Sequence, residues 1–161
     1  MNISKQCLML ILTTFIFLNI SLSGGDMELY KQDEDVFNFN LSSPEEFLEF
    51  LKKDISRFPE NFFFPYTIKE QPSDNWIKPE HIPGLINLIN SQEPCSPVMS
   101  IFSSTIPTKL STIGDEAMFM IEGFRAKRYP PRPNSRTYTS KEKEAILQWW
   151  RDWSKQNNIQ K

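Results

Sequence analysis

The chain has little of the residue types that build metal centres and disulfide frameworks. Its 161 residues include two cysteines and one histidine. These are too few for a zinc site made of cysteine and histidine ligands, and we expect neither a metal nor a cofactor. Glycine is scarce, at five residues, whereas there are 13 Phe, 4 Tyr and 4 Trp. This composition argues against a disordered or fibrous chain and favours one globular domain.

The sequence also lacks the usual motifs of catalysis. It contains no nucleophile elbow, phosphate-binding loop, dinucleotide fingerprint or paired-histidine zinc motif. The rival interpretation is a small hydrolase that uses Cys95 with His81, 14 residues before it. A buried, inert cysteine is the more common role for a lone thiol, and intermolecular or redox use stays open. We therefore expect a protein without catalytic chemistry.

The first 23 residues resemble a secretory signal. Lys5 precedes an apolar run over 7–20, and small residues stand at 21 and 23. This pattern predicts cleavage between Ser23 and Gly24 and a secreted or periplasmic protein. An uncleaved anchor is the alternative, but the run is shorter than the roughly 20 residues that span a bilayer. Asn40 begins a glycosylation sequon, which matters only if the producing cell glycosylates proteins.

Helical periodicity dominates the remaining sequence. We expect an acidic arm over 24–42 and an α-helical domain over 43–161. Capping boxes predict helix starts at Ser43 and at Thr139, and Thr112 is a third candidate cap. Apolar stripes with helical spacing follow each of them, and Ile121 and Trp150 should share one core. Weaker patterns predict further helices over 83–91 and 96–102 and an extended segment over 61–68. No alternating strand pattern is apparent, so the prediction is an all-α bundle of about five helices.

Part of the chain resembles HEAT-like helical repeats. The segments PGLINLIN, STIGDEAMFMIEGFR and YPP, and the ending EAILQWWRDWSKQN, carry this resemblance over about 82–157. Such proteins pack helix pairs, and their surfaces bind other proteins. The resemblance therefore implies HEAT-like helix pairs and a binding role instead of a reaction.

Charge is unevenly distributed along the chain. Residues 24–60 contain 10 acidic and 4 basic residues, whereas 124–161 contain 10 basic and 3 acidic ones. The basic patch can attract an anionic partner, or it can pair with the acidic N-terminal half of the same chain, which we favour. If a partner exists, the candidate contact residues are Arg125, Arg128, Tyr129, Arg132 and Arg136.

The most consistent function from the sequence is an exported protein-binding module. An accessory protein, an inhibitor and an immunity-type protein all fit this description. Besides the hydrolase, the alternative is an envelope-associated structural protein held electrostatically by its basic C-terminal third. We expect a protein partner, no nucleic acid and no membrane span after signal removal, with peripheral envelope contact as a further option.

Overall fold

A computed structural model describes residues 36–57 and 63–159. The expected signal, its cleavage point at Ser23 and Gly24, and most of the acidic arm lie outside the described residues. One compact unit runs from Phe37 to Lys161 and thus includes the last residues of the expected arm. In this part, Phe37 packs on Phe47 with ring centroids 4.7 Å apart, and Phe39 packs on Trp76 at 4.9 Å.

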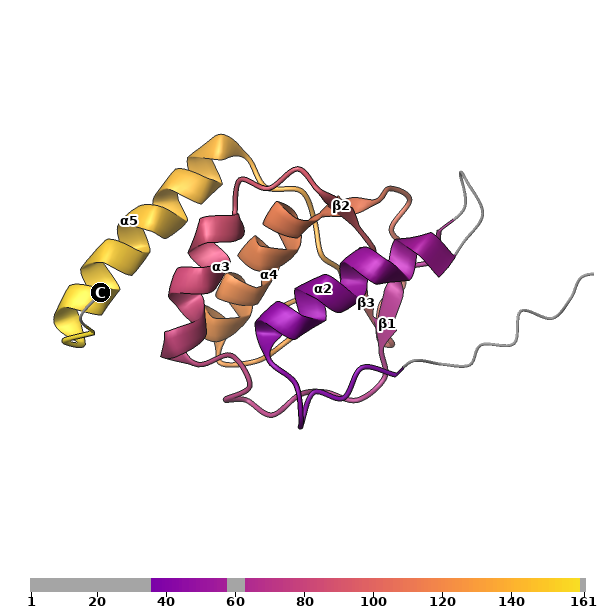
Figure 1. The fold of residues 1–161 in the computed structure, drawn as a ribbon, viewed down its shortest axis with the longest axis horizontal. Coiled ribbons are helices and arrows are strands. Elements are labelled where there is room, and N and C mark those ends of the chain that lie inside the picture. Colours follow the sequence, from indigo (N-terminus) through magenta and orange to yellow (C-terminus); the bar gives the residue numbers. More distant parts are fainter. Residues whose placement is uncertain (1–35, 58–62, 160–161) are drawn as a thin grey trace, which may run out of the picture. The chain divides into compact units, whose positions relative to one another are not determined.

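The described residues form a mixed α/β fold, so the prediction of an all-α, five-helix bundle is wrong (Figure 1). Four α-helices are present in these residues: α2 (Pro44–Asp54), α3 (Ile82–Leu88), α4 (Ile113–Ala126) and α5 (Ser140–Gln156). Two short 3₁₀ turns are η1 (Ile55–Arg57) and η2 (Pro79–His81). The strands are β1 (Tyr66–Ile68), β2 (Pro94–Cys95), β3 (Val98–Ser100) and β4 (Ser111–Thr112).

The four strands form two small sheets. β1 pairs in parallel with β3, Tyr66 opposite Val98, and β2 pairs in antiparallel with β4. The expected helix over 96–102 is therefore replaced by β3 and a turn. Strands of two or three residues are too short to show alternation, and their pairing depends on partners far along the chain. The expected extended segment over 61–68 does contain β1.

The three predicted caps are confirmed and fix where the long helices begin. The Ser43 hydroxyl accepts from the Glu46 amide at 3.2 Å, and the Glu46 carboxylate accepts from the Ser43 amide at 2.7 Å. Thr139 and Glu142 form the same capping box at α5. Thr112 caps α4 by accepting from the Asp115 amide at 3.1 Å. Each cap satisfies amides that would otherwise lack a partner in the first helical turn.

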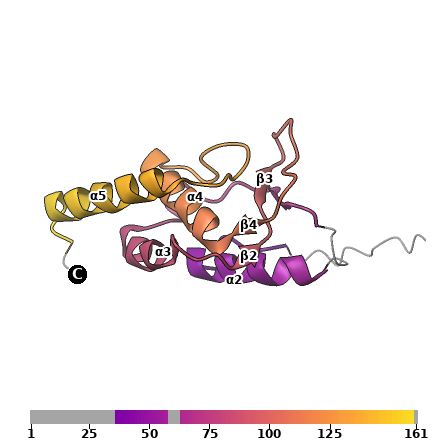
Figure 2. The same ribbon diagram turned by 90° about the horizontal axis from the view of Figure 1, so that it is seen from above.

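The helix α4 is the centre of the fold. Figure 2 shows it between α5 on one side and α2 and α3 on the other. Every residue from Ile113 to Ile121 is buried, as expected for a helix enclosed on all sides. Gly114 makes the contact with α3 possible, because a Cβ there would lie 2.6 Å from the carbonyl oxygens of Ile89 and Ser91. Ile121 and Trp150 belong to one core, as predicted.

Candidate functional site

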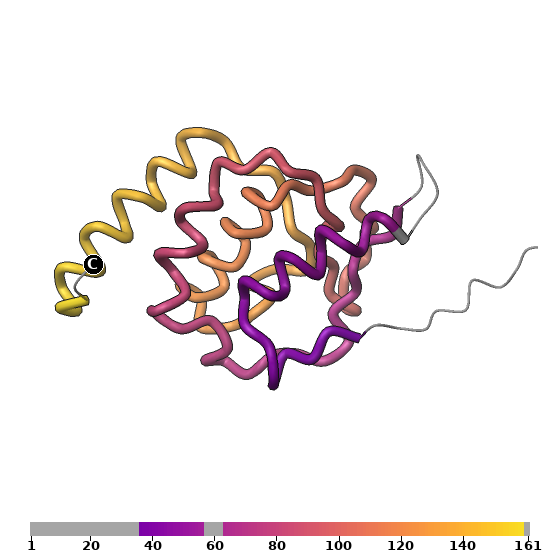
Figure 3. Tube along the Cα trace, in the orientation of Figure 1, coloured from indigo at the N-terminus to yellow at the C-terminus, as the bar shows by residue number. Residues whose placement is uncertain are grey.

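The predicted contact loop connects α4 to α5, and Figure 3 traces its path. Its arginines bind groups of the same chain. Arg132 lies 2.7 Å from Glu122, and Arg136 lies 2.6 Å from Glu142. Arg128 donates to the Pro131 carbonyl oxygen at 2.9 Å. The acidic partners of Arg132 and Arg136 stand on α4 and α5, whereas the sequence analysis favoured partners in the acidic N-terminal half.

Tyr129 is part of the core, although the sequence analysis placed it among the candidate contact residues. Its side chain is 2% exposed, and its ring centroid lies 5.1 Å from that of Trp76 and 5.7 Å from that of Phe119. Gly123 allows this packing, because a Cβ at that position would lie 3.0 Å from the Tyr129 ring and 3.1 Å from the Arg128 carbonyl oxygen. Burial of Tyr129 pins the beginning of the loop to α4.

Cys95 and His81 occupy settings that do not favour nucleophilic chemistry. Cys95 is a buried, free thiol on β2, and burial followed by the nearby Glu116 charge raises its pKa. The thiolate that a nucleophile requires is therefore disfavoured. The His81 Nδ1 accepts from the Lys78 amide at 3.2 Å, which caps η2. The geometry offers the hydrolase alternative no support.

A buried carboxylate on α4 is the most unusual polar group of the core. Glu116 is fully buried, and no hydrogen bond of good geometry reaches either of its carboxylate oxygens. Burial raises its pKa to about 7, although the Ser111 and Ser135 hydroxyls favour the charged form. The Tyr129 hydroxyl is also buried without a partner, and the Glu116 charge contributes to its raised pKa. A fully buried carboxylate of this kind affects the stability of the fold through its protonation.

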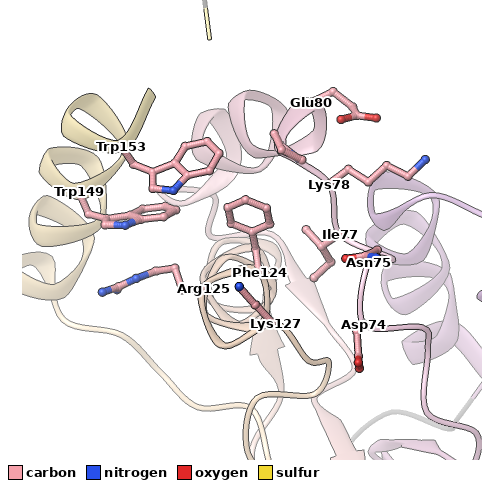
Figure 4. Close-up of a pocket in the computed structure, with 11 residues that line it drawn as sticks. Asp74, Asn75, Ile77, Lys78, Glu80, Phe124, Arg125, Lys127, Trp149 and Trp153 are labelled. Atoms are coloured by element: carbon pink, nitrogen blue, oxygen red, sulfur yellow. The ribbon is translucent and has the colours of Figure 1, made fainter. Parts of the chain in front are cut away.

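A groove of about 650 Å³ lies between α4, α5 and the segment that leads into η2. Figure 4 shows Trp149 and Trp153 reaching from α5 towards Phe124 of α4, with Ile77 on the other side of Phe124. The Phe124 ring centroid lies 5.3 Å from that of Trp153 and 6.2 Å from that of Trp149. All three aromatic side chains are half-buried, so each keeps part of its surface in solvent. The groove therefore has an aromatic wall.

Charged side chains border this aromatic wall. The Arg125 guanidinium lies 5.0 Å from the centroid of the Trp149 ring, in a cation–π contact. In Figure 4, Arg125 lies below Trp149 and Lys127 below Phe124, whereas Lys78 and Glu80 lie at the upper right. Within the part of the chain that the structure describes, Arg125, Lys127 and Lys78 make no ion pair. Their charges are available to a ligand.

Lys127 has a backbone conformation that normally favours glycine. It ends α4 in the left-handed region, with φ 53° and ψ 35°. A side chain there costs free energy that glycine would not. Many helices end with a residue in this conformation. Lys127 also lines the groove, so this helix end places a cation at the edge of the groove.

Arg125 is a candidate from the sequence, but the groove is not. An apolar stripe is predicted along the helix that begins at Thr139, yet of the three tryptophans on that helix only Trp150 is buried. Successive residues of an α-helix point about 100° apart, so Trp149 and Trp150 cannot both point to the centre of the core, and Trp149 packs at its edge. That doublet was the one available signal that part of the tryptophan surface lies outside the core.

Comparison with known proteins gives no relative from which a function can be taken. No protein-family model matches the chain, and neither a curated protein nor a solved structure matches it. The resemblance to HEAT-like repeats is thus neither supported nor opposed by the comparisons. In the described ranges, no His, Cys, Asp and Glu side chains gather as a metal site. None of the helices described has the length and apolarity needed to cross a membrane.

Proposed function

We propose that the chain is an exported protein-binding module whose contact surface is the groove between α4 and α5. The partner that fits best is a peptide segment carrying apolar and acidic side chains. The proposal rests chiefly on one observation: three half-buried aromatic side chains line one groove beside an arginine that makes no ion pair with any described residue. Accessory, inhibitory and immunity-type roles all use such a surface.

The aromatic wall supplies the apolar part of this recognition. Tryptophan offers large contact area at low cost in conformational entropy, and it is enriched among the residues that dominate binding energies. Trp149 and Trp153 are held by their neighbours, because their ring centroids lie 6.1 Å apart and Trp153 stacks on the buried Trp150 at 5.4 Å. The wall is therefore preorganised, which reduces the entropy lost on binding.

Arg125 and Lys127 supply the charged part. Both are exposed and unpaired among the described residues, and Arg125 is oriented by the Trp149 ring. Such an arrangement favours acidic partners and accelerates encounter with them.

Selection from a random peptide library on the purified protein tests the proposal. We expect enrichment of peptides that combine Asp or Glu with aromatic or aliphatic residues. Binding of the synthetic peptides should change the intrinsic tryptophan fluorescence, which provides a direct titration. Trp153→Ala should lower the affinity for the selected peptides by more than about tenfold, and Arg125→Gln should lower it by about fivefold.

Arg151→Gln is the matched control, because Arg151 is exposed on α5 but does not line the groove. It should leave the affinity unchanged. Circular dichroism melts identify any variant that binds weakly only because it is unfolded. Selected peptides without acidic residues, or peptides insensitive to both groove substitutions, would refute this groove as the contact surface.

A further inference from the structure

A second exposed feature lies away from the groove, in the loop between β3 and β4. Figure 2 shows this loop, residues 101–110, projecting beyond the small sheets. Its large apolar side chains face solvent: Phe102 is 85% exposed, Ile106 69%, Ile101 51% and Leu110 46%. On an ordinary protein surface, exposed apolar side chains are scattered singly, whereas here four lie within ten residues. Concentrated patches of this kind mark interaction sites.

We propose that this loop inserts into the interfacial layer of a lipid bilayer that contains anionic lipids. The inference does not depend on the proposed peptide groove. The loop is a convex projection, and a fluid interface accepts a projecting apolar tip without requiring a complementary cavity. Binding to an interface scales with the buried apolar area and with attraction to anionic headgroups.

The charges in and around the loop suit binding to an anionic bilayer. No acidic residue occurs between 94 and 114, and the single charge in this stretch is Lys109. Lys109 is exposed and makes no ion pair with any described residue. Lys69 and Glu70, which follow β1 near Ile101, carry opposite charges and balance each other. Carboxylates, which an anionic surface would repel, are thus confined to the base of the loop.

The basic connection between α4 and α5 lies against the same loop. The Asn134 side-chain amide donates to the Thr105 carbonyl oxygen at 2.9 Å, and the Ser100 amide donates to the Pro133 carbonyl oxygen at 2.7 Å. This connection carries Arg128, Arg132 and Arg136: Arg132 is paired with Glu122 and Arg136 with Glu142, whereas Arg128 makes no ion pair with any described residue. Basic residues near an anionic membrane strengthen binding, each by about fivefold close to the surface.

Several backbone groups in the first half of the loop form local hydrogen bonds. The Phe102 amide donates to the Ser100 hydroxyl at 3.2 Å, and the Thr105 amide donates to the Ser103 hydroxyl at 3.2 Å. The Ser103 hydroxyl in turn donates to the Thr105 carbonyl oxygen at 2.7 Å. These bonds satisfy polar groups locally, which reduces the cost of removing the tip from water.

A second copy of the chain is the less suitable occupant. One concave surface that could receive the tip of a second copy is the groove with the aromatic wall. Docking there would bring Lys109 of one copy towards Arg125 and Lys127 of the other. Like charges across an interface oppose association. Self-association is nevertheless a defined outcome of the experiment below.

A fluorescent probe at the tip of the loop tests the proposal in the full chain. Phe102→Cys carries an environment-sensitive dye. Cys7→Ser removes one of the two natural cysteines, and the other, Cys95, is buried. The apolar run over 7–20 can itself bind lipid, so the readout must report on the loop alone. We expect vesicles of phosphatidylcholine with phosphatidylglycerol to shift the dye emission to the blue. Brominated lipid should quench it.

Leu41→Cys provides the matched control, because Leu41 is 83% exposed and lies outside the loop. The emission of a dye at position 41 should change little when vesicles are added. Ile106→Ser in the Phe102→Cys background should reduce the fraction of dye fluorescence that brominated lipid quenches several-fold. Vesicles of phosphatidylcholine alone should give a smaller response. Equal responses at positions 41 and 102, or vesicle binding with no response at 102, would overturn the proposal. If the dye emission at position 102 shifts with rising protein concentration in the absence of lipid, the loop mediates self-association instead.

Discussion

The Arg136 guanidinium donates to the Glu142 carboxylate at 2.6 Å, and this carboxylate also completes the capping box of α5. Glu142 accepts from the Thr139 amide and from the Thr139 hydroxyl, each at 2.8 Å. Arg136 also lies over the Tyr138 ring, 4.2 Å from its centroid. One acidic residue thus begins a helix and holds the preceding loop, so the orientation of the loop and the start of α5 are coupled.

We predict that this contact makes the protein sensitive to acid. The hydrogen bond from Arg136, followed by those from Thr139, lowers the pKa of Glu142 from its ordinary value of 4.5 to about 2. A lowered pKa in the folded state stabilises the protein above the unfolded value, and the contribution disappears as the pH falls through the folded one. Stability from Glu142 should therefore decline between pH 4.5 and about pH 2.

Urea unfolding at a series of pH values measures this decline. Glu142→Gln should flatten the pH dependence in that range while retaining part of the cap, because an amide can also accept from Thr139. Glu144→Gln, an exposed neighbour on α5, serves as the control and should behave as the wild type. An identical acid profile for Glu142→Gln and the wild type would contradict the coupling between the loop and α5.

Glu116 should change the stability of the fold with pH in the opposite direction to Glu142, and over a higher range of pH. Its folded pKa of about 7 lies above the ordinary value of 4.5, so the folded state binds more protons between these values. Stability must then fall as the pH rises from 4.5 to 7, by up to about 3 kcal/mol. Glu116→Gln removes the charge and should be more stable than the wild type above pH 7. Denaturation at pH 5 and pH 8 checks this, and a wild type equally stable at both values would contradict the prediction.

The parts of the fold that sequence could predict are those set by neighbouring residues. The caps at Ser43, Thr112 and Thr139 depend on groups three residues away, so the pattern and the structure agree. The strands depend on distant partners: Tyr66 pairs with Val98, and no local pattern encodes that pairing. This difference explains why the three capped helices could be predicted, whereas the strands, including β3 in place of the expected helix over 96–102, and the mixed fold class could not.

The candidate site, too, is predictable from the sequence only in part. Arg125 was identified from charge alone, and the structure places it beside the groove. Tyr129 was expected at the surface, because aromatic residues in a basic, proline-rich loop are typical of contact surfaces. Its burial depends on Gly123, which lets the loop approach α4. The sequence shows a glycine in the last turns of a helix but does not show which side chain it admits.

Two substitutions of Lys127 separate the effect of this position on stability from its effect on binding. Because its φ of 53° is strained for any residue with a Cβ, Lys127→Gly should stabilise the fold by about 0.5–1 kcal/mol. The same change removes a cation from the edge of the groove, so acidic peptides selected on the wild type should bind about fivefold more weakly. Lys127→Gln keeps the strain and removes the charge, and we expect it to lose affinity without gaining stability. Thermal melts and fluorescence titrations of both variants make the comparison. A glycine variant that gained no stability would show that the helix end carries no strain, and two variants with wild-type affinity would show that Lys127 takes no part in binding.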